Sequence, residues 1–268
     1  MANPATKNLS GNRPAAFIGG AAIGTLGGLI GLGGAEFRLP LLIGSFGFAA
    51  LEAVILNKAM SLVVVTFALP FRAATVPFGQ IAAHWPIILN LLSGSLIGAW
   101  VGAGWATRLK SETLYKVIAT LLLIIAVVLV FGHDIAVGQP LVTGTAQIMA
   151  GGVAGLIIGV VASLLGVAGG ELLIPTLILL FGADIRLAGS LSLAVSLPTM
   201  IVGFTRYSRD RSFAVLVRNR PFLLVMAAGS VLGAFLGGKL LGIVPSVVLL
   251  PTLALILVVS AIKVWRHA

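Results

Sequence analysis

The sequence contains no cysteine, and charged residues make up only 9% of its 268 positions. The lack of cysteine excludes disulfides, thiolate zinc sites and thiol nucleophiles. Soluble domains carry about 25% charged residues, whereas this chain is 59% hydrophobic with a mean hydropathy of +1.16. Because there is too little polar side chain to cover a water-facing surface, a soluble enzyme is excluded, and the predicted solvent is the lipid bilayer.

Acidic residues are also scarce, with 7 Asp and Glu against 17 Lys and Arg and a net charge of +10. Integral membrane proteins concentrate Lys and Arg in cytoplasmic loops, so we predict no nucleic-acid partner. The histidines His84, His133 and His267 lack metal-ligand spacing, and we expect neither a metal nor a cofactor. Ser95, His133 and Asp134 are the residue types of a hydrolase triad. However, Ser95 lies in a glycine-rich stripe without a nucleophile elbow, so no enzyme is predicted.

The apolar segments form two halves that repeat with an offset of 135 residues. Segments 36–48 and 171–182 occupy equivalent places, and both are shorter than the about 20 apolar residues that span a bilayer. Residues of several types keep the offset without gaps, among them Gly34, Glu36, Pro40 and Phe46, which match Gly169, Glu171, Pro175 and Phe181. We predict a duplication, with a cytoplasmic segment at 1–15, a first repeat at 16–132, a connecting loop at 133–145 and a second repeat at 146–268.

Positive charge changes sides between equivalent loops. Loop 73–85 has little charge while its counterpart 206–220 carries five arginines, and loop 107–116 is basic while its counterpart 242–246 carries no charge. Lys and Arg mark the cytoplasmic side, so we predict inverted repeats with both termini and the two basic loops inside. Inverted repeats require an odd number of membrane crossings in each half. A re-entrant hairpin followed by three spanning helices meets this requirement, and five short crossings per half meet it as well. A parallel arrangement leaves more Lys and Arg outside.

Each short segment follows a glycine-rich tip, Gly31-Leu32-Gly33-Gly34 in the first half and Gly166-Val167-Ala168-Gly169-Gly170 in the second. Glycine lets backbone N–H groups converge on one point, and a half-helix directs the positive end of its dipole there. Two tips that enter from opposite faces would form an anion site. The predicted fold is therefore all-α and polytopic, with two inverted repeats whose broken, glycine-tipped helices meet near the bilayer midplane. The alternative is that these glycines only allow helices to cross closely.

The candidate substrate-binding residues are Gly31, Gly33, Gly34, Glu36, Asn57, Lys58, Ser61, Gly166, Gly169, Gly170, Glu171, Ser192 and Ser196. Glu36 and Glu171 are also candidates for proton coupling, because a carboxylate at the positive end of a half-helix competes with an anion until it is protonated. Alternatively, they cap their helices. Lys58 would attract an anion or pair with Glu36, or else snorkel to the interface. The serines would bind the anion or join helices.

A glycine-rich tip followed by an apolar residue pair and proline, present twice, resembles the TauE/SafE family of exporters of sulfite and sulfur-compound anions. The resemblance covers nearly the whole chain. It implies a multi-pass transporter in the cell (inner) membrane that exports a small sulfur-containing anion, sulfite or organosulfonate-like, by alternating access. An importer of a small anion and an anion-selective, channel-like conduit are the alternatives. The sequence leaves the oligomeric state open, a homo-oligomer included.

Overall fold

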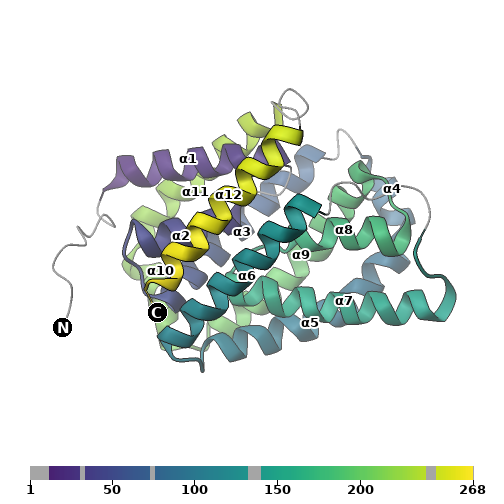
Figure 1. The fold of residues 1–268 in the computed structure, drawn as a ribbon, viewed down its shortest axis with the longest axis horizontal. Coiled ribbons are helices and arrows are strands. Elements are labelled where there is room, and N and C mark those ends of the chain that lie inside the picture. Colours follow the sequence, from purple (N-terminus) through teal and green to yellow (C-terminus); the bar gives the residue numbers. More distant parts are fainter. Residues whose placement is uncertain (1–11, 31–33, 73–75, 132–139, 240–245, 268) are drawn as a thin grey trace.

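The part of the chain that the structure describes contains helices and no strand (Figure 1). The computed structural model describes residues 12–30, 34–72, 76–131, 140–239 and 246–267. The longer helices are α1 (Arg13–Ile30), α3 (Ala50–Arg72), α5 (Trp85–Ala106), α6 (Ser111–Phe131), α7 (Gly144–Leu165), α9 (Ile185–Tyr207), α11 (Arg220–Lys239) and α12 (Ser246–Trp265). Six of them are long and apolar enough to cross a membrane, since 22 helical residues extend about 33 Å. The prediction of an all-α, multi-pass membrane protein is confirmed.

The two short segments form helices of their own, α2 (Ala35–Gly44) and α8 (Gly170–Phe181). Each begins after a glycine in the left-handed region, with φ of 69° at Gly34 and 82° at Gly169. Glycine populates this region without steric penalty, so the chain can reverse direction there.

Both short helices run back along the helix before them. The amide of Leu141, just before α7, donates to the carbonyl of Leu179 near the end of α8 at 2.9 Å. In the first half, Leu41 near the end of α2 lies against Gly19 near the start of α1. The pairs α1–α2 and α7–α8 are therefore helical hairpins.

Glycines bring the hairpins into backbone contact with the other half. A Cβ on Gly20 or Gly28 of α1 would meet the carbonyl oxygens of Met226 or Ala234 of α11, at 2.3 and 2.5 Å. Both contacts advance in the same direction, so the two helices run parallel. The matching pair, α5 and α7, is packed as closely, because a Cβ on Gly98 would lie 2.1 Å from a carbonyl oxygen of α7. The glycines of these four helices therefore form packing surfaces.

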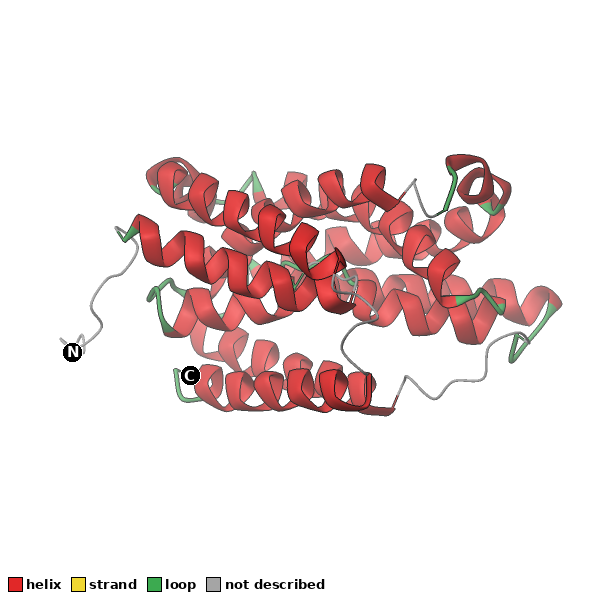
Figure 2. Ribbon diagram, turned by 90° about the horizontal axis from the view of Figure 1, so that it is seen from above, coloured by secondary structure: helices red, strands yellow, loops and turns green. Residues whose placement is uncertain are grey.

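The hairpins occupy opposite ends of the bundle (Figure 1). The start of α1, helix α2 and the end of α12 lie toward the end that carries α10 (Val215–Arg218). Helix α8 and the start of α7 lie toward the end that carries α4 (Phe78–Ala83). Seen from above, the helices run approximately along the long axis (Figure 2).

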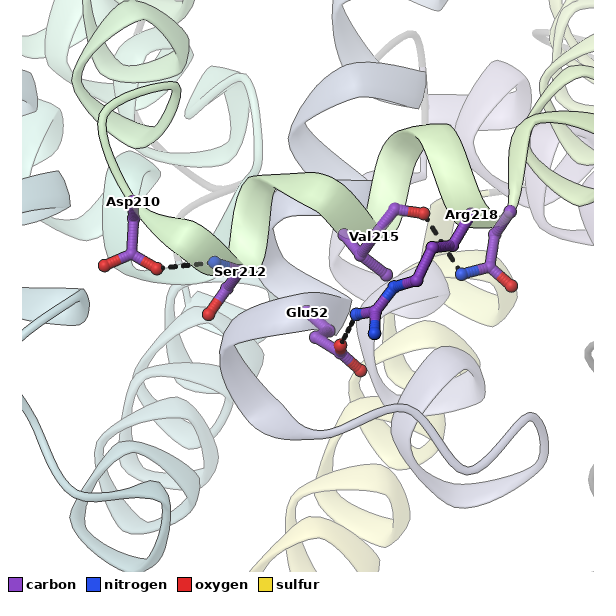
Figure 3. Close-up of polar contacts among 6 residues, drawn as sticks. Glu52, Asp210, Ser212, Val215 and Arg218 are labelled. Atoms are coloured by element: carbon purple, nitrogen blue, oxygen red, sulfur yellow. Dashed lines mark hydrogen bonds and ion pairs between the residues drawn. The ribbon is translucent and has the colours of Figure 1, made fainter.

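The connection from α9 to α11 is ordered by short-range polar contacts (Figure 3). The Asp210 carboxylate accepts a hydrogen bond from the Ser212 amide at 2.8 Å, at the start of η2 (Arg211–Ala214). Arg218 of α10 pairs with Glu52 of α3 at 2.5 Å. The Arg218 side chain is largely exposed, so this pair contributes little stability, but it joins the connection to α3.

Candidate substrate site

The centre of the bundle buries an unusual number of polar side chains for a chain of this composition. The buried set includes Glu36, Arg38, Asn57, Lys58, Ser61, Ser163, Glu171, Ser192, Ser196 and Ser230. Gly31 and Gly33, which the sequence analysis assigned to the site, lie outside the described residues. Each of the other predicted site residues is buried.

Arg38 on α2 forms the most extensive of these contacts. Its Nε donates to Asn57 Oδ1 at 2.8 Å, its Nη2 to Ser61 Oγ at 2.8 Å, and its Nη1 to Ser230 Oγ at 3.1 Å. The guanidinium is completely buried, yet all three acceptors are neutral. A guanidinium has five N–H donors, so the described contacts leave part of its hydrogen-bonding capacity unused. Arg38 thus joins α2 to α3 and α11.

Asn57 on α3 connects the two tips. Its Nδ2 donates to the carbonyl of Ala35 at 2.9 Å, at the start of α2, and to the carbonyl of Leu165 at 3.1 Å, at the end of α7. One turn further on, Ser61 Oγ donates to the carbonyl of Gly166 at 3.4 Å. Both predicted residues therefore lie where the hairpins meet.

Lys58 is fully buried and does not snorkel. Its Nζ donates to the Ala162 carbonyl at 3.2 Å and to Ser163 Oγ at 3.5 Å, both on α7. The predicted pairing with Glu36 is wrong, because the oxygens of that carboxyl group accept no hydrogen bond from any described residue. The Lys58 side chain extends toward the last turn of α7, which supplies its acceptors, whereas Glu36 lies on the other hairpin.

The serines of the second half make shorter-range contacts. Ser196 Oγ donates to the carbonyl of Ala168 in the second tip at 2.7 Å. Ser192 Oγ donates to Gly189 O of its own helix at 2.9 Å. Ser196 therefore holds the tip, whereas Ser192 bonds within α9.

The tip glycines also have close packing neighbours. A Cβ on Gly34 would lie 2.4 Å from the carbonyl oxygen of Ile23, and one on Gly166 would lie 2.3 Å from that of Val54. At Gly169, a Cβ would meet only side-chain atoms at 3.2 Å. Substitution of Gly34 or Gly166 would therefore disturb the fold directly, whatever their part in binding.

Glu36 and Glu171 occupy the first turns of α2 and α8. They are 0% and 3% exposed, and all four carboxyl oxygens lack a hydrogen-bond partner among the described residues. The caps of the two helices are glycines, so the carboxylates do not satisfy the helix ends.

Three residues of this centre were missing from the predicted site. Arg38 lies two residues after Glu36, and a cation inside an apolar segment was the available signal, but the sequence does not show what it faces. Ser230 matches Ser95 of the glycine-rich stripe at the offset of 135 residues, and it accepts a hydrogen bond from Arg38. Tyr207, whose OH donates to the carbonyl of Ser163 at 2.8 Å, gave no signal, because it ends a helix without a counterpart in the repeat.

The fold and its centre define a polytopic helical membrane protein with a buried, charged polar site. A model of the family described as sulfite exporter TauE/SafE matches residues 4–264, and the chain belongs to this family. The resemblance found in the tip motifs is thus confirmed. No curated protein and no solved structure matches the chain. Membership of this family indicates a membrane transporter of sulfur-containing anions.

Proposed function

We propose that this chain exports a small sulfur-containing anion, such as sulfite, across the cell membrane by alternating access. One observation carries the proposal: Arg38 and Lys58 are buried beside two half-helix N-termini, and every acceptor found for them is neutral. Buried charge is costly without compensation. An anion that enters this centre would gain both positive charges and the free amides of the first turns of α2 and α8.

The topology that we propose has two inverted repeats, with re-entrant hairpins at α1–α2 and α7–α8. Its support is the location of α2 and α8 toward opposite ends of the bundle (Figure 1), together with the contacts that return each short helix to the start of its hairpin. The end that carries α10 is rich in Lys and Arg, so we assign this end and both termini to the cytoplasm. The repeats then correspond to residues 16–132 and 146–268.

Glu36 and Glu171 supply the proposed coupling to protons. Two ionised carboxylates in the centre would repel an incoming anion strongly, because charges interact over longer range in a poorly hydrated interior. Protonation removes this repulsion. An anion could therefore load together with a proton, and the tips would release it when the proton leaves.

Transport by the purified protein in liposomes tests the proposal. Vesicles loaded with unlabelled sulfite should accumulate labelled sulfite by counterflow that saturates with concentration, and chloride should compete weakly. A flux that never saturates and shows no counterflow would indicate a channel-like conduit instead. Protein of known orientation, with a gradient imposed in each direction, separates export from import.

Lys58→Met provides the matched site variant, because it removes the buried charge and nearly keeps the side-chain length. Glu112→Gln is the control: Glu112 pairs with Lys116 on the exposed surface of α6, and its loss should leave transport unchanged. If Lys58→Met protein that is folded transports sulfite with wild-type affinity, the buried cation is not part of the substrate site.

A further inference from the structure

Two arginines at the end of α9 lie against one tryptophan of α5. The guanidinium carbon of Arg206 is 5.6 Å from the centroid of the Trp100 ring, and that of Arg209 is 4.9 Å from it. Gly104, one turn beyond Trp100, leaves room for the first of these side chains, because a Cβ there would lie 3.4 Å from Arg206 Nε. Since both guanidiniums approach the same ring, two positive charges are held close together.

The backbone that follows α9 places Arg209 beside Arg206. The chain continues in a turn after the helix, in which the Ser208 amide donates to the carbonyl of Phe204 at 3.0 Å. The Phe204 ring packs against Phe213 of η2, with the ring centroids 5.1 Å apart, and this contact holds the connection against α9. Side chains three positions apart on a helical turn lie on the same side. The fold therefore directs both arginines toward α5.

None of the acidic residues that the structure describes forms an ion pair with these two arginines. Asp210 is the nearest of them in sequence, and its carboxylate accepts a hydrogen bond from the Ser212 amide at 2.8 Å. The others form ion pairs elsewhere, cap the far end of α9 or are buried in the centre of the bundle: Glu52, Glu112, Asp184, Glu36 and Glu171. An aromatic ring at an exposed site attracts a cation only weakly, so an anion would find two charges that are not neutralised.

The surface beside the two arginines is apolar along α5. The Trp100 side chain is 38% exposed, and Ile97, which lies three residues earlier on the same side of the helix, is 58% exposed. Tryptophan is enriched where membrane and water meet, because its ring is amphipathic. An occupant that fits both features carries a negative group next to an apolar chain. A phospholipid has both, whereas a free inorganic anion has only the first.

We infer that Arg206, Arg209 and Trp100 form a binding site for the headgroup phosphate of an anionic phospholipid. A guanidinium presents its N–H donors in a planar fork that matches two phosphate oxygens. Neither guanidinium donates to a described residue, so these donors are available. The acyl chain would follow Ile97 along α5. Because α9 supplies the charges and α5 supplies the ring, the bound lipid would join the ends of these two helices.

Native mass spectrometry of the purified full chain in detergent, titrated with short-chain phospholipids, is the first test. Dioctanoyl phosphatidylglycerol should bind as a single copy, at least about tenfold more tightly than dioctanoyl phosphatidylcholine, because the choline cation is repelled by the two arginines. Inorganic phosphate in excess should not displace the bound lipid. Equal affinity for the two lipids, or displacement by phosphate, would overturn the inference.

Single arginine variants distinguish a defined site from a general attraction of basic loops to anionic lipid. Arg206→Gln and Arg209→Gln should each weaken phosphatidylglycerol binding by at least about tenfold, through loss of a charged donor. Arg211→Gln is the matched control, because Arg211 is an exposed arginine of the same connection, and no ring contact is found for it among the described residues. If Arg211→Gln weakens binding as much as Arg209→Gln does, the attraction is diffuse and the inference is wrong.

Thermal unfolding in the same detergent gives a second readout and checks the fold of each variant. A ligand that binds only the folded state raises Tm by mass action. Phosphatidylglycerol should therefore raise the Tm of the wild type and of Arg211→Gln, and it should raise that of Arg209→Gln much less, while all three proteins unfold at similar temperatures without lipid. An equal rise for Arg209→Gln would contradict the proposed site. Neither outcome bears on sulfite transport, which the counterflow assay tests separately.

Discussion

Removal of the Asn57 side chain should destabilise the protein strongly, because this side chain bonds to both hairpins. In Asn57→Leu, the Arg38 guanidinium loses one acceptor, and the carbonyls of Ala35 and Leu165 both lose their side-chain donor. A hydrogen bond to a charged group contributes about 1.5–3 kcal/mol and a neutral one about 1 kcal/mol. The expected loss is therefore about 4 kcal/mol of unfolding free energy. At about 2–4 °C for each kcal/mol, Tm should fall by about 10 °C.

The repeat supplies a matched control for this prediction. Ser192 occupies the position of Asn57 in the second half, but its hydroxyl bonds only to Gly189 of its own helix. Ser192→Ala should therefore lower Tm by only about 2–4 °C, from the loss of one neutral hydrogen bond. Asn57→Asp, which keeps an acceptor for Arg38 but loses both donors, should fall between the two. Differential scanning fluorimetry in one detergent compares all three variants. If Asn57→Leu melts no lower than Ser192→Ala, Asn57 does not hold the two tips together.

Three further outcomes follow from the same contacts. Single cysteines at Gly79 and Glu112 should report the two sides of the membrane: an impermeant thiol reagent added outside cells should label position 79 and spare position 112, and the reverse pattern would contradict the inverted topology. Gly98→Val should prevent stable folding, because its Cβ would meet the carbonyl oxygen of Leu156 at 2.1 Å. Gly79→Ala, which has open space around it, should fold normally. Equal yields of the two folded variants after membrane extraction would exclude the close α5–α7 contact. Lys58→Met should raise the KM for sulfite at least about tenfold, because loss of a hydrogen bond to a charged group weakens binding by about 1.5–3 kcal/mol, and unchanged KM in proteoliposomes would argue against an electrostatic role.

Local sequence features were sufficient for the elements of the fold. Long apolar runs require helices in lipid, because only a helix or a closed barrel satisfies every backbone group without water. The left-handed glycines at Gly34 and Gly169 could be anticipated as chain reversals, since few other residues adopt that backbone conformation. The contact of α1 with α11 and of α5 with α7 could not be anticipated, because a glycine stripe indicates that a helix packs closely but not which helix it meets.

The repeat predicted which residues occupy equivalent positions in the two halves, but it did not predict which residues they contact. It identified Glu36 and Glu171 as equivalent residues beside the tips, and the structure buries both of them without a hydrogen-bond partner among the described residues. It also matched Asn57 with Ser192, but the two side chains make different contacts. Asn57 bonds to both hairpins, whereas Ser192 bonds within its own helix. Arg38 has no charged counterpart, so its role as a connector between α2, α3 and α11 is a property of one half only.

The sequence by itself determined that this protein resides in lipid, that it is helical, and that matching residues recur at an offset of 135 around two short segments that follow glycine-rich tips. These conclusions depend on composition and spacing, which report how each segment meets its solvent. The tertiary structure decided which buried donors meet which acceptors. Lys58 bonds to α7 instead of Glu36, and the oxygens of both buried glutamates accept no hydrogen bond from the described residues. Such pairings depend on how helices far apart in the chain are rotated and staggered when they pack, and no local pattern encodes that geometry.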